Sequence, residues 1–341
     1  MPTSSNSTRP WAMGGRRSAV RHGLSVAALV LLVGCGGSVE GVVVDLNKSN
    51  EDVLLGFYFG SYAGPDGGDP FEAGVLGRDG DAVTLNVDAL SEPVRAAFAG
   101  AAEDGRLDWD EAKTAFQATY AEARPFPATL DDFQRGIAYL GASGAPADGW
   151  FSVEIDGVMT QARRRLYVPK AALRQALRAY DANSEQVIYP AGTALIGEHW
   201  LDGERAEVTI KQKRADGFWD FLVYDAAGVL ADGTTTPPRA LTAPTQCVGC
   251  HLGTKLYEPE KSFPARAPDG PHGPRAIYLD DSVRDHPETR AVTERLAEHR
   301  TRSDSVLGLY ATLFVADLLA DRRAGLALAP EDTAVLDALG Y

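Results

Sequence analysis

Three consecutive runs decide the fold of this chain: GTALIGEHW (192–200), RAEVTIKQK (205–213) and GFWDFLVYD (217–225). All three are rich in β-branched and aromatic residues, which favour strands. RADG separates the second run from the third, and DAAG follows the third, so turn residues punctuate the pattern. The runs therefore predict an antiparallel meander.

Other segments on both sides of the meander also have recognisable patterns. Helical spacing and turn residues predict helices over 91–140, over AALRQALRAY (171–180) and over 287–341. WFSVEIDGV (150–158) predicts a hairpin that turns at Asp156-Gly157. The apolar runs VLLGFYFG (53–60) and AVTLNVD (82–88) are interpreted as strands, with a Gly/Asp-rich loop between them, and 254–285 is interpreted as irregular. The fold class predicted is α+β, with an antiparallel sheet domain between helical N-terminal and C-terminal segments.

The segment TQCVGCHLG (245–253) follows the meander and carries the chemistry. Cys247 and Cys250 are separated by two residues, and His251 follows directly. Two thiols at this spacing can add to the two vinyl groups of one haem edge, and the adjacent histidine then supplies the proximal nitrogen to the iron. The predicted cofactor is one covalent haem c, with Cys247 and Cys250 as thioether residues and His251 as the iron ligand.

Other uses of the cysteine pair stay open. A zinc site usually takes a second pair of ligands, and the chain has only three cysteines. A thioredoxin-like redox pair usually follows a tryptophan, but this chain has Gln246 at that position. A disulfide between Cys247 and Cys250 would make the protein a non-haem structural lipoprotein.

The beginning of the chain has the pattern of an export signal. Basic residues precede the apolar run LSVAALVLLV (24–33), which is too short to span a bilayer. Leu32-Val33-Gly34-Cys35 resembles a bacterial lipobox, in which the cysteine is acylated and becomes the mature N-terminus. This resemblance implies a signal peptide over 1–34, a lipid anchor at Cys35 and a tether over 35–50. The implied position is on the outer membrane facing the periplasm, or on the cell surface; a plain secretory signal is the alternative. Haem c is attached outside the cytoplasm in bacteria, so export agrees with the motif.

The net charge of the chain restricts the kinds of binding partner that are expected. Residues 1–34 hold four of the 33 basic side chains, so the mature chain has 29 against 47 acidic ones, a net charge of −18. An acidic surface argues against nucleic acid and against anionic membrane surfaces as partners. Contact with the membrane is expected through the lipid anchor only.

The sixth ligand of the iron is constrained by residue types. The three methionines are Met1, Met13 and Met159, so none follows His251 and a His/Met electron carrier is not expected. An open iron site is the leading prediction. The alternative is an electron-transfer cytochrome with two histidine ligands, and the further histidines of the mature chain are His199, His272, His286 and His299.

Residues 165–260 resemble the cytochrome P460 family, which includes the β-type cytochromes c′. The resemblance rests on Tyr189-Pro190-Ala191-Gly192-Thr193, on Phe218-Trp219-Asp220-Phe221 and on the late CxxCH motif. It implies a haem pocket on an antiparallel sheet and redox or small-ligand chemistry, with nitric oxide or hydroxylamine-type molecules as ligands. Trp219 and Phe221, which alternate with Asp220 and Leu222, are the candidate pocket residues, although core packing explains that alternation equally well.

Family members that oxidise hydroxylamine carry a lysine cross-linked to the haem. This chain has Gly197-Glu198 where that lysine is expected, and Lys211 and Lys213 on the next strand are the possible substitutes. Glu198, Lys211 and Lys213 are therefore further candidate site residues. The implied organisation is an N-terminal region of unknown role over 51–150, a haem domain over 151–265 and a helical extension over 266–341.

A weaker pattern lies in EDGRLDWDEAKTAF (103–116), which resembles the second half of an EF-hand loop. Gly105 and Glu111 fit that loop, but Gly100 and Ala102 stand where oxygen donors are expected. A helix that begins after Asp108, with acidic residues in its first turn, explains the same residues and is favoured.

Overall fold

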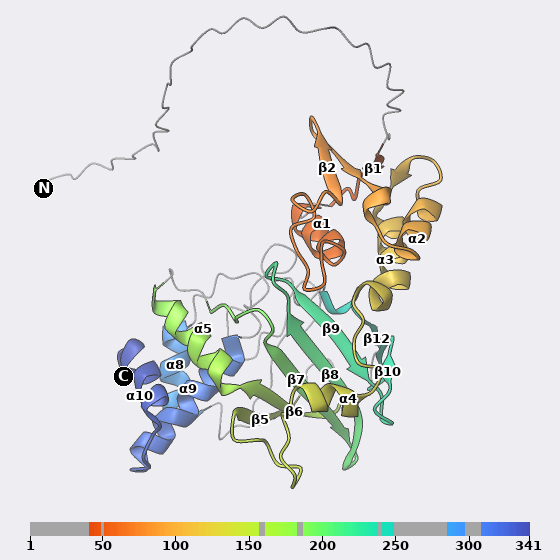
Figure 1. Ribbon diagram of the computed structural model, residues 1–341. Helices are drawn as coiled ribbons and strands as arrows, with labels where there is room; N and C mark the ends of the chain where they lie inside the picture. Colours follow the sequence, from red (N-terminus) through yellow and green to blue (C-terminus); the bar gives the residue numbers. More distant parts are fainter. Residues whose placement is uncertain are drawn as a thin grey trace, which may run out of the picture. The chain divides into compact units, whose positions relative to one another are not determined.

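The computed structural model of the protein describes residues 41–48, 51–156, 161–182, 187–237, 240–248, 285–296 and 308–341. Figure 1 shows the helices and strands of these residues. Residues Gly41–Tyr341 form one compact unit. The fold is α+β with antiparallel sheets, as predicted. Cys35, the expected lipidation residue, and the irregular segment predicted over 254–285, apart from Asp285, lie outside the described residues.

A six-stranded sheet is the centre of this unit, and the predicted meander forms half of it (Figure 1). Its strand order is β10-β9-β8-β7-β6-β5, and every neighbouring pair is antiparallel. Sequence neighbours are therefore also neighbours in the sheet. The strands are β5 (Trp150–Asp156), β6 (Arg163–Pro169), β7 (Ala194–Leu201), β8 (Glu204–Lys213), β9 (Trp219–Tyr224) and β10 (Leu230–Ala231).

The turns of the sheet follow from their residues. Asp202 and Gly203 join β7 to β8 and both have positive φ, 53° and 85°, which a two-residue hairpin of type I′ requires. Gly217, with φ of 88°, occupies the turn between β8 and β9. β5 and β6 form the predicted hairpin, with Asp156 opposite Arg163, although Gly157 lies outside the described residues.

Both faces of the sheet are buried, and each has its own hydrophobic cluster. We call them the Trp219 face and the Tyr167 face. The Trp219 face includes Phe151, Ile155, Leu166, Val168, Leu195, Trp219 and Phe221. The Tyr167 face includes Tyr167, Ala194, Ile196, Val208, Ile210, Leu222 and Tyr224. Every residue of β9 is buried, so this strand is covered on both sides.

Helices supply the cover for both faces. Leu130 and Phe133 of α4 (Leu130–Gly136) pack on the Tyr167 face. On the Trp219 face, Phe314 of α9 (Gly308–Arg323) contacts Phe151, with ring centroids 5.5 Å apart. α5 (Lys170–Ala182) belongs to the same cluster and is joined by Arg174 to Asp332 of α10 (Pro330–Ala338). With α8 (Pro287–Leu296), these helices confirm the predicted helical C-terminal segment.

The N-terminal region forms a second, smaller sheet with three helices. The sheet order is β2-β3-β1-β4, in which β1 and β4 are parallel and the other pairs are antiparallel. Its strands are β1 (Val42–Val44), β2 (Leu76–Asp79), β3 (Ala82–Leu85) and β4 (Arg106–Leu107). The helices are α1 (Glu51–Gly60), α2 (Val94–Ala101) and α3 (Trp109–Ala123), with a short 3₁₀ helix, η1 (Val87–Ala89), after β3.

One predicted element of this region is wrong. VLLGFYFG, interpreted as a strand, forms most of α1. Seven residues of α1 are buried, from Val53 to Gly60, so apolar side chains are needed on nearly all sides of this helix. A short, continuously apolar run has no periodicity that separates a buried strand from a buried helix. The predicted strand over 82–88 is confirmed as β3 over its first four residues.

The predicted helix after Asp108 is confirmed. Asp108 is the N-cap of α3; its carboxylate accepts from the backbone N–H of Glu111, and the Glu111 carboxylate accepts from the N–H of Asp108. This reciprocal capping box uses both side chains to stabilise the helix terminus. Thr129 caps α4 in a similar way, by accepting from the N–H of Asp132. Among the helices that the structure describes, none is both long and apolar enough to cross a membrane.

Candidate functional site

Cys247, the first residue of the motif, lies at the border between the sheet and the N-terminal helices. Ala243 donates to the carbonyl of Asp232, just after β10, and its own carbonyl accepts from Gln117 of α3 at 2.7 Å. The side chain of Cys247 is half-buried against the hydrophobic cluster of the Trp219 face, and Val248 is buried within it. Cys250 and His251 lie outside the described residues.

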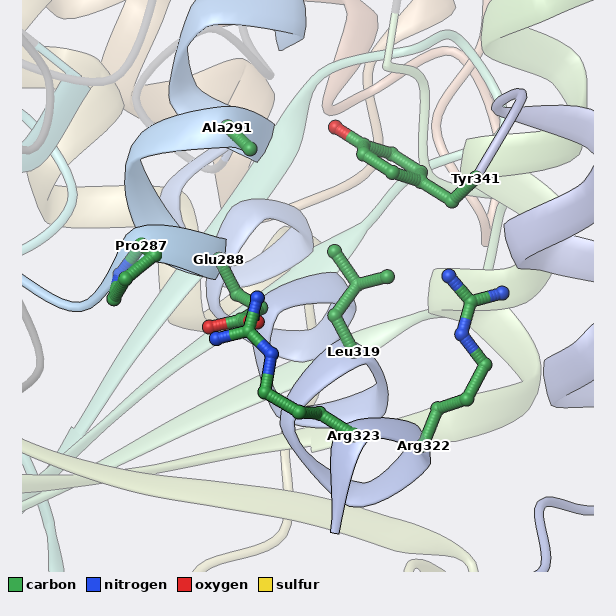
Figure 2. Close-up of a pocket in the computed structure, with 7 residues that line it drawn as sticks. All are labelled: Pro287, Glu288, Ala291, Leu319, Arg322, Arg323 and Tyr341. Carbon is green, nitrogen blue, oxygen red and sulfur yellow. The ribbon is translucent and has the colours of Figure 1, made fainter. Parts of the chain in front are cut away.

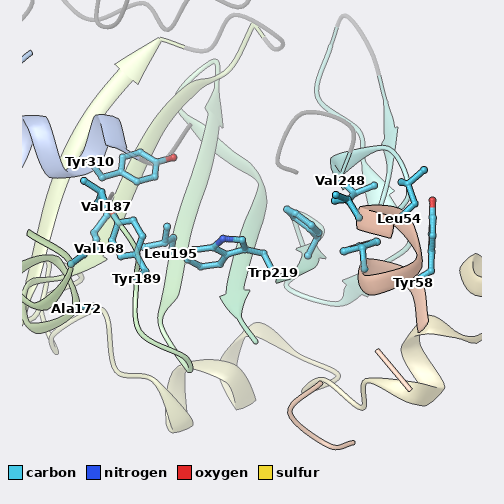
Figure 3. Close-up of a cluster of buried hydrophobic side chains, with 14 of the residues drawn as sticks. Leu54, Tyr58, Val168, Ala172, Val187, Tyr189, Leu195, Trp219, Val248 and Tyr310 are labelled. Atoms are coloured by element: carbon cyan, nitrogen blue, oxygen red, sulfur yellow. The ribbon is translucent and has the colours of Figure 1, made fainter. Parts of the chain in front are cut away.

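Aromatic side chains connect this border to the sheet. Phe57 of α1 contacts both Phe218 and Phe221, with ring centroids 6.0 Å and 6.4 Å apart. Figure 3 draws Val248 with Leu54 and Tyr58 of α1, Trp219 and Leu195 on the sheet, and Tyr189 from the segment before β7, all members of one cluster. The structure therefore brings both predicted aromatic residues, Trp219 and Phe221, into the same hydrophobic cluster as Cys247.

Two lysines lie on this apolar face. Lys211 is opposite Leu195 and Phe221 in the sheet register, and Lys213 is opposite Trp219, so all of them project from the same side. Lys213 is only 4% exposed, and its ammonium lies 4.9 Å from the centre of the Trp219 ring, a cation–π arrangement. Strand lysines usually extend into water; here both are on the buried Trp219 face.

A polar row crosses the same face four residues away from Lys211 along β8. Arg164 of β6, His199 of β7 and Glu207 of β8 are consecutive partners across three strands. The His199 Nε2 atom lies 3.1 Å from the Thr209 hydroxyl, and Nδ1 lies 3.5 Å from Glu207 Oε1. The sheet register shifts at His199/Trp200, which is the kind of irregularity that reorients side chains.

The Glu207 carboxylate is saturated by a neighbouring loop. It is 1% exposed and accepts from the backbone N–H groups of Thr235 and Thr236 and from both of their hydroxyls, at distances of 2.6 to 3.2 Å. These bonds hold the segment that follows β11 (Gly233–Thr234). β11 pairs with β12 (Leu241–Thr242), after which the chain continues to Cys247. Glu207 thus links the polar row to the segment of the chain that leads to the cysteine motif.

His199 is held in its neutral form. Burial, together with the positive charges of Arg164 and Lys211, lowers the pKa of His199 to about 3. The Nδ1 atom of His199 and the Nε atom of Arg164 are buried and have no hydrogen-bond partner among the described residues. Two unsatisfied buried polar atoms on neighbouring strands are uncommon, because each costs the desolvation of that group.

Glu198 lies on the opposite face of the sheet from these residues. Its carboxylate accepts from the hydroxyls of Tyr167, at 2.9 Å, and Tyr139, at 3.3 Å, and from the indole N–H of Trp200 at 3.3 Å. Burial and the nearby Glu198 charge raise the pKa of both tyrosines, so both hydroxyls stay protonated donors. The structure therefore separates Glu198 from Lys211 and Lys213, which project from the Trp219 face.

A buried ion pair links α3 to β9 behind the aromatic strand. Asp220 is fully buried, and its Oδ2 atom lies 2.6 Å from Nη2 of Arg124. Tyr120 of α3 donates to Asp220 and accepts from the backbone N–H of Phe221. These bonds fix the strand that carries Trp219 and Phe221 against the helix that contacts the segment before Cys247.

The remaining histidines are less informative. His286 has a side chain that is 42% exposed, and its Nδ1 atom lies 2.6 Å from Glu288 at the start of α8. His272 and His299 lie outside the described residues. A surface pocket between α8 and α9 is lined by Glu288, Arg323 and the C-terminal Tyr341, among others (Figure 2). It contains none of the predicted site residues.

The polar row was not predicted as a unit, although one signal of it is present in the sequence. Arg163-Arg164-Arg165 lies in an alternating strand, so the middle arginine must project to the face opposite its neighbours. That face is the one lined by Leu166 and Val168, which makes Arg164 a charge inside an apolar surface. Its pairing with His199 depends on the register of β6 and β7, which composition does not specify.

No group of three or more histidine, cysteine or acidic side chains suited to a metal ion is found in the part of the chain that the structure describes. Comparison of the chain with protein families, with curated proteins and with solved structures found no match.

Proposed function

We propose that this protein is an exported, lipid-anchored, monohaem c-type cytochrome that acts in redox or small-ligand chemistry, in the manner of the P460-like group. The observation that carries the proposal is the motif itself: Cys247, Cys250 and His251 are spaced as covalent attachment of haem c requires. The mature chain has no further cysteine pair to form a zinc site.

The surroundings of Cys247 fit such a cofactor. A haem needs a large apolar surface with a few polar groups, and its pocket decides ligand access. Cys247 borders a cluster that contains Trp219 and Phe221, with Lys211 and Lys213 on the same sheet face. In this proposal Cys247 and Cys250 hold the group, and His251 supplies the proximal nitrogen.

When bound, the haem would supply an iron that exchanges electrons or takes a diatomic ligand such as nitric oxide. The chain's own residues would determine access to it: the aromatic side chains exclude water, and Arg164, Lys211 and Lys213 raise the positive potential of this face. The position of Glu198 on the opposite face argues against its acting at the iron.

Covalent attachment is tested on a denaturing gel. The protein is expressed in the periplasm of a host with the haem c maturation machinery, and a haem-stained band is expected at the size of the chain. The double variant Cys247→Ala/Cys250→Ala should give the protein band without the stain. A wild-type band without stain, in a host that stains a control cytochrome c, would refute the proposal and favour the structural disulfide.

A further inference from the structure

Arg164 stands out as a charge without a counter-charge. Its neighbours in the sequence, Arg163 and Arg165, both pair with Glu154 on the other side of the sheet. Arg164 makes no such pair with any residue that the structure describes, and its Nε atom is buried without a partner. Burial lowers the pKa of this guanidinium, opposed by the nearby Tyr310 of α9. An unpaired charge inside a protein carries a desolvation penalty that proteins normally offset with an opposite charge.

The residues next to Arg164 do not supply that charge. His199, its partner on β7, is neutral. Glu207 is one strand further away, and its oxygens are already engaged by Thr235 and Thr236. Two nitrogens of the row, Arg164 Nε and His199 Nδ1, are therefore left without an acceptor.

We infer that Arg164 and His199 together bind a carboxylate or similar oxoanion on the Trp219 face, which in the haem-loaded protein is a haem propionate. A guanidinium is the side chain best suited to a carboxylate, because its planar N–H groups match the two oxygens. The Nδ1 atom of a neutral imidazole can donate to the same group when it carries the proton. This inference rests on the proposed function for the source of the carboxylate.

The sheet order supports a propionate as that source. The segment that leads to Cys247 is bonded to Asp232, next to the edge strand β10, and Arg164 lies on β6, beyond β9, β8 and β7 in the sheet. β6 is three strand spacings from β9, roughly 14 Å. In a haem, the propionates lie across the macrocycle from the vinyl edge that forms the thioethers, so a propionate of a haem held at Cys247 would lie away from that cysteine. Trp219, Phe221 and Leu195 provide apolar surface between the two sides.

The test measures the midpoint potential of the haem-loaded protein as a function of pH. Arg164→Gln removes a positive charge beside the propionate, so the potential should fall and the pKa of the propionate, visible in the pH profile, should rise. Arg164→Lys keeps the charge and should restore most of both values. Arg163→Gln is the matched control, since Arg163 is on the same strand but is exposed and paired with Glu154; it should leave both values unchanged.

Titration with nitrite distinguishes a free oxoanion from a haem propionate as the ligand of Arg164 and His199. If the pair binds a free anion rather than a propionate, Arg164→Gln leaves the potential unchanged without nitrite, and the wild type shows a saturable shift with nitrite that the variant lacks. That result would keep the binding site and replace the ligand. If Arg164→Gln changes neither the pH profile nor the response to nitrite, the inference is overturned.

A second variant covers the case in which Arg164→Gln does not load haem. In the haem-free background Cys247→Ala/Cys250→Ala, the guanidinium has no carboxylate, so Arg164→Met should raise the melting temperature, and formate should raise it only when Arg164 is present. A lower melting temperature in Arg164→Met, with no effect of formate on either protein, would overturn the inference. A wild type without haem stain refutes the proposed function, whereas the melting experiment tests the anion site independently.

Discussion

The burial of His199 makes the free energy of unfolding depend on pH. The imidazole is buried between Thr209, Glu207 and the charges of Arg164 and Lys211, and its pKa falls from 6.5 to about 3. Between these two values the unfolded chain binds a proton at His199 that the folded chain does not. The contribution of His199 to stability is therefore complete above pH 6.5 and is lost as the pH falls towards the folded value.

The replacement His199→Gln should remove this pH dependence. Gln keeps a polar group next to Thr209 but does not titrate, so the free energy of unfolding should fall less steeply with acid than in the wild type. The difference in slope is at most roughly 1.4 kcal/mol for each pH unit within this window. Urea titrations at a series of pH values measure it. His286→Gln, at an exposed histidine, should retain the wild-type slope; equal slopes in all three proteins would contradict the account of His199.

At the scale of elements, the contact between α3 and β9 depends on one buried ion pair. Arg124 and Asp220 are both buried, and Tyr120 adds a hydrogen bond to the same carboxylate. Removing one partner leaves the other charge buried and uncompensated, which typically costs about 3–5 kcal/mol.

Arg124→Met should therefore lower the free energy of unfolding by about that amount. The matched control is Arg163→Met, which breaks the exposed pair with Glu154 and should cost less than about 1 kcal/mol. Denaturant unfolding, followed by tryptophan fluorescence, compares the two variants. Equal losses would show that α3 is held to β9 by apolar contacts instead.

The elements themselves could be predicted from the sequence to different extents. The meander was predicted correctly because each of its strands ends in a turn with Asp or Gly, and Asp202-Gly203 then fixes the register. The helix α1 was not predicted correctly, because its apolar residues continue around the helix and leave no 3.6-residue pattern. The start of α3 after Asp108 was identified correctly from local spacing alone.

The candidate site was predictable only in part, for a related reason. Alternation along one strand placed Trp219 and Phe221 on a common face, and the structure confirms that placement. The burial of Lys213 and the pairing of Arg164 with His199 depend on which strands become neighbours. Such long-range contacts cannot be obtained from local patterns, since a shift of one residue in register would reverse the faces.

At the scale of the whole molecule, the protein is expected to be tethered. The resemblance of Leu32-Val33-Gly34-Cys35 to a lipobox implies acylation, and the net charge of −18 expected for the mature chain argues against binding to anionic lipids. Cys35→Ser should move the protein from the membrane fraction to the soluble fraction, or leave the signal peptide uncleaved. Fractionation with immunodetection measures this. A wild type that is already fully soluble, with the same distribution as the variant, would refute the anchor.

We propose an attached haem whose iron has an open site, and the spectrum of the reduced protein with and without carbon monoxide decides whether both are present. No methionine follows His251, and the Nε2 atom of His199 is engaged by Thr209. We therefore expect a five-coordinate, high-spin ferrous spectrum and direct binding of carbon monoxide, in the wild type and in His199→Ala, His272→Ala, His286→Ala and His299→Ala alike. A low-spin wild type that binds carbon monoxide only after one of these histidines is lost would contradict the open site, and a wild type without haem absorbance would contradict the claim altogether.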